Sequence, residues 1–214
     1  MNRLRNFLIL IFVLCIPVVL FLGVFRLTAF NMYFYESQFN EYEPKVENAV
    51  ETTAATLYFL KEKNAGTEYI SGYINEEQEH LIEVKGIIQD IFIVLYSTLA
   101  LLVAAGILLY FADKKNFLVN KGLALFYGGG FSAILVSVFL LLISCCFDKV
   151  FTLFHQIFFK TTWQFPVSSL LIRLFPKIFF IDIIVKIVIG IYAASLFFNI
   201  SGFYLIKKEK LRKK

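Results

Sequence analysis

The 214-residue sequence has little cysteine, histidine or charge: three Cys, two His and only 17% charged residues. Soluble domains carry about 25% charged and about 45–50% apolar residues. Here 59% of the residues are hydrophobic, and 26 Phe and 11 Tyr are among them. One small soluble globule cannot bury this surplus, and so many aromatic residues exclude a disordered chain. The composition therefore indicates an integral membrane protein.

Several sequence motifs of catalysis and metal binding are also absent. The three cysteines, Cys15, Cys145 and Cys146, form no disulfide framework or C-x-x-C pair, so we interpret them as small apolar residues of the apolar runs. The chain has no H-x-x-x-H, P-loop, G-x-S-x-G or H-x-x-x-x-D sequence. We therefore expect no metal, no nucleotide and no other cofactor. The glycines at 128–130 are expected to let helices approach closely rather than to bind phosphate.

Four apolar runs are long enough to cross a membrane. The first covers residues 7–25 without a charge, and a helix of that length spans about 28 Å, close to the roughly 30 Å of a hydrocarbon core. It is too long for the apolar region of a cleaved signal peptide, so we interpret residues 1–25 as a cytoplasmic start and an anchor. The other predicted spans cover residues 87–111, 122–147 and 183–206. The predicted fold is an all-α membrane protein with four transmembrane helices.

The charge distribution predicts the orientation. Eleven Lys and Arg but only two acids occupy residues 1–6, 112–121 and 207–214, whereas residues 26–90 hold 12 acids and five bases. Basic loops stay in the cytoplasm, so we expect both termini, the loop 112–121 and the basic tail 207–214 to lie inside. The net charge of +5 is then a sign of topology and not of nucleic-acid binding. Two segments, residues 26–86 and 148–182, are predicted to be extracytoplasmic.

Both outer segments are expected to be mostly helical. Apolar residues three and four apart predict an amphipathic helix over 44–63, which ends before Gly66 with that glycine at positive φ. Asn75 is predicted to cap a further helix, with Gln78 as its capping-box partner, and this helix is expected to continue into the second span. In the second outer segment, Phe147 begins an aromatic face that predicts a helix lying in the membrane interface.

The two histidines, His80 and His155, are both predicted to be extracytoplasmic. Three carboxylates share the helical face of His80, those of Glu76, Glu77 and Glu83. We expect them to orient one ring nitrogen and to raise the pKa of His80. His155 lies among Phe residues, where burial favours a neutral ring.

Several interpretations of the two histidines remain open. They could be a solvated surface residue and an interface filler, a catalytic pair, or two ligands of a metal site that a carboxylate completes; the last lacks any paired ligand spacing.

Other charged residues flank the predicted spans. Asp182 and Lys186 have the order and spacing of a helical ion pair, although Lys186 could instead extend toward water. Arg173 and Lys177 lie among apolar residues, where contact with lipid headgroups or with a substrate carbonyl is expected.

Two stretches resemble a known family. These are Asn75-Glu-Glu-Gln-Glu-His80-Leu-Ile-Glu-Val-Lys85 and Phe147-Asp-Lys-Val-Phe-Thr-Leu-Phe-His155-Gln-Ile-Phe-Phe159. Trp163, Leu-Ile-Arg173-Leu-Phe-Pro176 and Phe179-Phe180-Ile-Asp182 continue the likeness. The order of spans and loops agrees as well. The sequence is similar to the lipoprotein intramolecular transacylase family of bacterial four-span membrane proteins.

The resemblance implies an acyltransferase of the bacterial cell membrane. Such an enzyme moves the sn-2 acyl chain of a diacylglyceryl-modified lipoprotein to the α-amino group of the same lipidated cysteine, giving the lyso-form. His80 and His155 match the functional histidines of the family. We hypothesise that His80, supported by Glu77, is the general base and that His155 is the acid, or the reverse. The remaining supporting candidates are Glu83, Lys85, Asp148, Arg173 and Asp182.

The sequence leaves a competing class, a non-enzymatic membrane scaffold or assembly partner that binds lipid or lipoprotein. It explains the topology equally well. A transporter is disfavoured because the spans contain almost no charge near the middle of the membrane. The expected partners of the enzyme are lipoprotein N-termini and membrane lipid.

Overall fold

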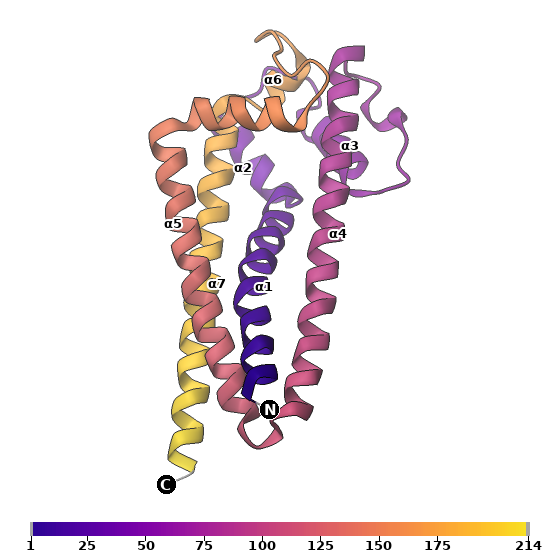
Figure 1. Ribbon diagram of the computed structural model, residues 1–214. Helices are drawn as coiled ribbons and strands as arrows, with labels where there is room; N and C mark the ends of the chain where they lie inside the picture. The colour runs from indigo at the N-terminus through magenta and orange to yellow at the C-terminus, as the bar shows by residue number, and fades with distance from the viewer. Residues whose placement is uncertain (1, 213–214) are drawn as a thin grey trace. The chain divides into compact units, whose positions relative to one another are not determined.

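The computed structural model describes residues 2–212 and contains four long helices (Figure 1): α1 (Asn2–Ala29), α4 (Asn75–Ala112), α5 (Phe117–Phe158) and α7 (Lys177–Arg212). No strand occurs within that range. Each of the four is long and apolar enough to cross a membrane. The predicted all-α fold with four spanning helices is therefore confirmed. Two bases of the predicted tail, Lys213 and Lys214, lie outside the described residues.

The chain forms two compact units, and each of the four long helices contributes to both. One unit contains residues 1–25, 94–142 and 187–214, and the other contains residues 26–93 and 143–186. The short η2 (Lys114–Asn116) belongs to the first unit. The second unit holds α2 (Met32–Tyr42), α3 (Ala49–Lys61), η1 (Thr67–Ile70) and α6 (Leu170–Leu174), together with both histidines.

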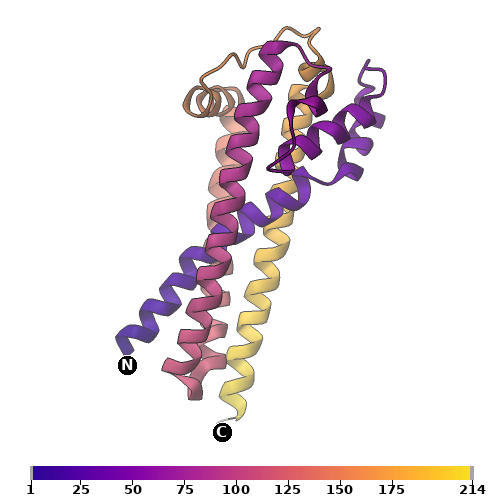
Figure 2. The same ribbon diagram turned by 90° about the vertical axis from the view of Figure 1, so that its right-hand side faces the viewer.

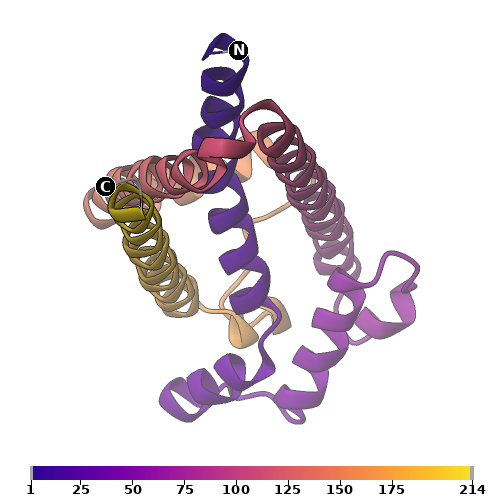
Figure 3. The same cartoon turned by 90° about the horizontal axis from the view of Figure 1, so that it is seen from below.

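In the first unit, glycines bring helix backbones into contact. Seen from below, α5 and α7 lie side by side (Figure 3), and a Cβ on Gly202 would come within 2.6 Å of the backbone nitrogen of Phe126. A Cβ on Gly129 would lie 2.8 Å from the carbonyl oxygen of Ser195, and one on Gly128 would meet Ile16 at 2.6 Å. The expected close helix approach at this glycine run is confirmed.

In the second unit, α2 and α3 follow one another (Figure 2). The predicted helix over 44–63 exists but is shorter, because α3 begins only at residue 49. Glu43 and Asn48 have left-handed backbones, with φ of 42° and 56°, and so interrupt the helix on that side.

The predicted helix ends before Gly66, as expected, but the predicted positive φ of Gly66 is wrong. Gly66 has φ −85° and ψ 178°. Instead, side chains of α4 satisfy carbonyls at the end of α3 and just after it: Gln89 Nε2 donates to the carbonyls of Leu60 and Lys61, the last two residues of α3, and Lys85 Nζ donates to that of Ala65.

The start of α4 is capped one residue earlier than predicted. The carbonyl of Ile74 accepts the first helical bond from the N–H of Gln78, and the backbone N–H of Ile74 donates to Glu77 Oε2 at 3.2 Å. Glu77 is therefore the capping-box partner, and Gln78 instead donates its side-chain amide to the carbonyl of Tyr73. The expected continuation of this helix into the second span is confirmed, because α4 runs unbroken to Ala112.

The helix α5 is kinked at Cys146, whose φ of −145° and ψ of 34° are not helical. After the kink, residues 147–158 form the helix that was expected in the second outer segment. This helix runs toward the first turns of α4 (Figure 1). The kink therefore brings the segment that carries His155 close to the segment that carries His80.

Candidate functional site

The rings of His80 and His155 meet in the second unit. Their centroids are 6.0 Å apart, and the ring planes differ by only 13°. His80 lies in the second turn of α4, and His155 lies in the part of α5 that follows the kink. Both side chains are buried, with 6% and 8% of their surface exposed. Two imidazoles that are 75 positions apart in the chain thus form one buried pair.

Aromatic rings surround this pair. Phe159 contacts both imidazoles, with centroid distances of 4.5 Å to His80 and 5.0 Å to His155. The ring centroid of Trp163 lies 4.9 Å from that of His155, and the ring centroid of Phe165 lies 5.6 Å from that of His80. Such walls exclude water from the imidazoles and lower the local dielectric constant.

The ring of His155 has a defined hydrogen-bonding direction. Its Nδ1 lies 2.8 Å from the backbone carbonyl oxygen of Phe151, one turn earlier on the same helix. Because a carbonyl oxygen only accepts, Nδ1 must donate, and Nε2 of the neutral ring then carries the lone pair. The Nδ1 of His80, in contrast, is buried and has no hydrogen-bond partner among residues 2–212.

Both histidines favour the neutral form. Burial, and then the proximity of His155, lower the pKa of His80 to about 4, although the Glu83 carboxylate acts in the opposite direction. Burial also lowers the pKa of His155, against the effect of its bond to the Phe151 carbonyl. The expected neutral ring of His155 is confirmed. The Glu83 carboxylate acts on His80 in the expected direction, but the expected net rise in the pKa of His80 is wrong, because burial and His155 outweigh that carboxylate.

Glu77 does not support His80 in the way that the sequence predicts. Its side chain is only 1% exposed, and Oε1 accepts a hydrogen bond of 2.8 Å from the backbone N–H of Leu171. Its second oxygen accepts from the N–H of Ile74. Glu77 therefore joins the start of α4 to the first turn of α6, because buried backbone N–H groups compete successfully for its carboxylate.

Glu83 joins the two histidine-bearing segments directly. Both of its carboxylate oxygens lie 3.2 Å from the backbone nitrogen of Lys160. One oxygen also accepts from the backbone N–H and the hydroxyl of Thr161, at 3.2 and 2.8 Å. Burial would raise the pKa of Glu83, but these hydrogen bonds together lower it below its usual value. The ionised carboxylate thus holds the segment after α5 against α4.

The pair can accept and donate protons in a site that contains little water. Within residues 2–212, no group of three His, Cys, Asp or Glu side chains is arranged to hold a metal ion. The geometry favours proton transfer between a bound substrate and Nε2 of His155, and a hydrogen bond from the neutral ring of His80.

The family model of lipoprotein intramolecular transacylase Lit matches residues 10–180 of the chain. The chain belongs to the lipoprotein intramolecular transacylase family. It is therefore a transacylase, an enzyme that transfers acyl groups. No curated protein matches the chain in sequence.

Solved structures of the membrane integral transacylase Lit from Bacillus cereus share the fold. One is 20% identical to this chain, with a TM-score of 0.85, and the match covers 99% of this chain and 100% of the other. Two further structures carry a histidine replaced by arginine or by alanine. The arginine variant is 19% identical with a TM-score of 0.82, over 99% of this chain and 96% of the other. The alanine variant is 20% identical with a TM-score of 0.82, over 98% and 97%.

Several supporting candidates in this transacylase lie apart from the histidine pair. Lys85 donates to the carbonyl of Ala65 and lies 4.3 Å from the centroid of the Phe59 ring, so it stabilises the segment after α3. Asp148 forms an exposed ion pair with Lys177. Arg173 is an exposed residue of α6.

The predicted ion pair between Asp182 and Lys186 is not found among the described residues. The ammonium of Lys186 lies 5.1 Å from the centroid of the Phe34 ring instead. The Asp182 carboxylate acts on Tyr42: burial first, and then this negative charge, raise the pKa of Tyr42. For Lys186, an aromatic ring of α2, a helix that the sequence analysis did not predict, thus replaces the expected helical partner.

The sequence analysis also missed part of the site. Phe159, Thr161 and Phe165 were not proposed as site residues, and Trp163 was noted only for the family resemblance. The available signal was the position of these residues at the end of the second resembling stretch or just after it, because a short segment that follows His155 must remain close to it.

Proposed function

We propose that this transacylase moves the sn-2 acyl chain of a diacylglyceryl-modified lipoprotein to the α-amino group of the lipidated cysteine, and that His80 and His155 carry out the proton transfers. The observation on which the proposal rests is the buried pair of parallel imidazoles, 6.0 Å apart. Two neutral histidines, enclosed by aromatic rings, match a reaction in which an amine loses a proton and an alkoxide gains one.

The reaction is balanced without a cofactor. The amine nitrogen attacks the carbonyl carbon of the sn-2 ester, so an amide C–N bond forms and the ester C–O bond breaks. The proton that leaves the nitrogen arrives on the sn-2 oxygen. Both reacting groups belong to one molecule, and effective molarities of about 10⁵–10⁸ M show how much positioning alone can contribute to the rate.

We assign the proton shuttle to His155. Its Nδ1 donates to the Phe151 carbonyl whether the ring is neutral or charged, so that Nε2 is the nitrogen that gains and loses the proton. Nε2 accepts the proton of the attacking amine and then delivers it to the departing oxygen. An α-amino group has a pKa of about 7.7–8.0, which is within reach of an imidazole base.

We assign the stabilisation of the oxyanion to His80. Its pKa near 4 keeps the ring neutral, and a neutral imidazole donates a hydrogen bond without losing its proton. The sequence left two assignments open, and these observations support the second, in which His155 is the base and His80 donates the hydrogen bond. The contacts of Glu77 support this choice, since its carboxylate binds Leu171 and not His80.

The surrounding rings would also protect the reaction. Water that reached the ester would hydrolyse it and release a fatty acid instead of forming the amide. Phe159, which contacts both imidazoles, and Trp163 occupy positions from which they exclude water.

We place the site on the extracytoplasmic side of the bacterial cell membrane. The support is the charge asymmetry of the sequence, in which the segments that carry the histidines are acidic and the opposite loops are basic. The exposed Arg173 would then lie where lipid headgroups of that leaflet are available.

The proposal is tested in a bacterial host that lacks its own transacylase, by mass spectrometry of lipoprotein N-termini. His80→Ala and His155→Ala should each abolish the lyso-form while the protein still inserts, whereas Gln156→Ala, at an exposed neighbouring position, should leave product formation unchanged. Full product formation by either histidine variant would remove that histidine from the mechanism.

A second pair of variants tests the two roles. Gln has an N–H donor but no basic nitrogen, so His80→Gln should retain a measurable fraction of the activity, and His155→Gln should retain none. The opposite result would exchange the roles.

A further inference from the structure

The first unit contains a polar cavity whose role is not connected with the histidine pair. Its volume is about 390 Å³, and it lies between the N-terminal turns of α1, the start of α5 and the end of α7. Three aliphatic residues line it, Ile9, Val119 and Leu123. Six polar residues complete the lining: Arg5, Asn6, Asn116, Asn120, Glu209 and Lys210. The sequence analysis had placed these positions in the predicted cytoplasmic segments or beside them.

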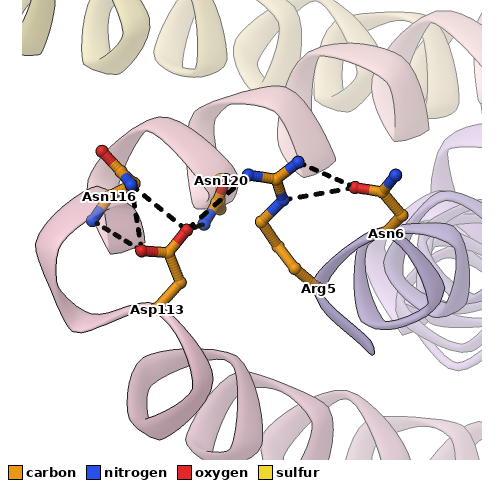
Figure 4. Close-up of polar contacts among 5 residues, drawn as sticks. All are labelled: Arg5, Asn6, Asp113, Asn116 and Asn120. Atoms are coloured by element: carbon orange, nitrogen blue, oxygen red, sulfur yellow. Dashed lines mark hydrogen bonds and ion pairs between the residues drawn. The ribbon is translucent and has the colours of Figure 1, made fainter. Parts of the chain in front are cut away.

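Hydrogen bonds hold one wall of this cavity in place (Figure 4). The Asp113 carboxylate accepts from the side-chain amides of Asn116 and Asn120, at 3.0 Å in each case. Asn120 is 97% buried. Arg5 lies between this group and Asn6: its Nη1 is 3.9 Å from Asp113, and its Nε and Nη2 donate to Asn6 at 3.2 and 3.1 Å. The cation of Arg5 therefore has a fixed position on the wall.

The charge balance around the cavity favours an anion. Asp113 lies 3.9 Å from Arg5 and also accepts from the asparagine amides, and Glu209 accepts from the Arg212 guanidinium at 3.0 Å. These two carboxylates therefore offset Arg5 and Arg212, and Lys210 adds a further positive charge. Hydrogen bonding by Asn120, above all, holds the pKa of Asp113 below its usual value. Arg5 and the exposed Lys210 line the cavity itself.

The other residues that line the cavity indicate which chemical groups the ligand carries. Side-chain amides bind hydroxyl groups and phosphate oxygens, and the aliphatic residues provide contact for a glycerol backbone and the start of an acyl chain. Basic pockets between membrane helices bind the headgroups of anionic lipids. A purely polar solute would make no use of the aliphatic wall.

We infer that this cavity binds the headgroup of an anionic phospholipid such as phosphatidylglycerol, with the phosphate between Arg5 and Lys210 and the headgroup hydroxyls at the side-chain amide of Asn6. The lipid would join the ends of α1, α5 and α7. This site is separate from the proposed reaction and does not depend on it.

The test uses the full-length protein in a neutral detergent, with native mass spectrometry to measure bound lipid and thermal unfolding to measure stabilisation. Phosphatidylglycerol should bind and raise the unfolding temperature more than phosphatidylcholine. Lys210→Gln should weaken phosphatidylglycerol binding about fivefold, as expected for the loss of one basic residue. The matched control is Lys207→Gln, which removes the same charge from the same helix at a position that does not line the cavity.

Three results would overturn the inference. One is equal binding of the two lipids, and another is an equal effect of the two lysine variants. The third is full stabilisation by soluble glycerol phosphate, which would show a site for a free phosphoester in place of a lipid site. Because Lys210 is exposed, its replacement should not change the unfolding temperature in the absence of lipid.

Discussion

Replacing Glu83 by Gln should loosen the segment that follows α5. The Glu83 carboxylate accepts from the backbone N–H groups of Lys160 and Thr161 and from the Thr161 hydroxyl. A glutamine retains one neutral acceptor and places an NH₂ group opposite backbone donors. Since this segment leads from Phe159 to Trp163, which both contact His155, its loosening should also affect the reaction.

The size of the effect follows from the hydrogen bonds. A bond to a charged acceptor contributes about 1.5–3 kcal/mol and a neutral one about 0.5–1.5 kcal/mol. Glu83 is half-buried, so water reduces the difference. We expect Glu83→Gln to cost about 1–2 kcal/mol of local stability, which corresponds to an increase of about 5- to 30-fold in the population of the open segment.

Amide hydrogen exchange at residues 160 and 161 measures this opening directly. The exchange should accelerate about 5- to 30-fold in Glu83→Gln, and kcat should fall more than KM changes. The control is Glu79→Gln, an exposed glutamate on the same helix, which should change neither quantity. Thr161→Val, which removes only the hydroxyl bond, should have a smaller effect.

The effect should also depend on pH. Because the folded-state pKa of Glu83 is lowered, its contribution is complete above the usual glutamate pKa and is lost as the pH falls through the lowered value. Exchange at residues 160 and 161 that is no faster in Glu83→Gln than in Glu79→Gln, at neutral pH, would refute the reasoning.

The structure supports three further predictions. Glu77→Ala removes a carboxylate that is 1% exposed and leaves the N–H of Leu171 without its acceptor. We expect the free energy of unfolding to fall by about 2–3 kcal/mol, measured as a lower unfolding temperature. An unchanged unfolding temperature would contradict the role of this contact. Gly202→Ala places a Cβ 2.6 Å from the backbone nitrogen of Phe126 and should lower the unfolding temperature by several degrees. In the control, Gly23→Ala, the new Cβ meets nothing within 4 Å, and the unfolding temperature should not fall. Equal effects of the two variants would argue against backbone contact between α5 and α7. Because the pKa of His155 is lowered, its neutral ring persists below pH 6.5. After correction for ionisation of the substrate amine, with its pKa of about 7.7–8.0, kcat/KM should therefore fall only below pH 6.5. A corrected enzyme pKa above 6.5 would contradict neutral histidines in the free enzyme.

The large features of the fold could be predicted because they follow from hydropathy over long windows. The spans and the helix after residue 75 belong to this class, and so does the close approach at Gly128 and Gly129. Each depends on apolar run length or on side-chain size, which are local properties of the sequence.

The details that sequence analysis predicted wrongly depend on tertiary partners. Glu77 shares a helical face with His80, yet it binds Leu171, which is 94 positions away. The pKa of His80 was expected to rise because three carboxylates are near in sequence, and it falls because of burial beside a second imidazole. The end of α3 was predicted from Gly66, but Gln89 of another helix satisfies its carbonyls. In each case a residue that is distant in the sequence determines the hydrogen bond, the pKa or the capping of the helix end that the local pattern predicted wrongly.

The two glutamate contacts also bear on how the enzyme is made. Glu77 requires the N–H of Leu171, and Glu83 requires those of residues 160 and 161, so neither contact exists while the ribosome is still adding the residues before them. The nascent first half of the protein, although it already contains His80, has no complete reaction site. The proposed site is therefore complete only after residue 171 has been added, and a protein truncated before residue 160 should form no lyso-form product.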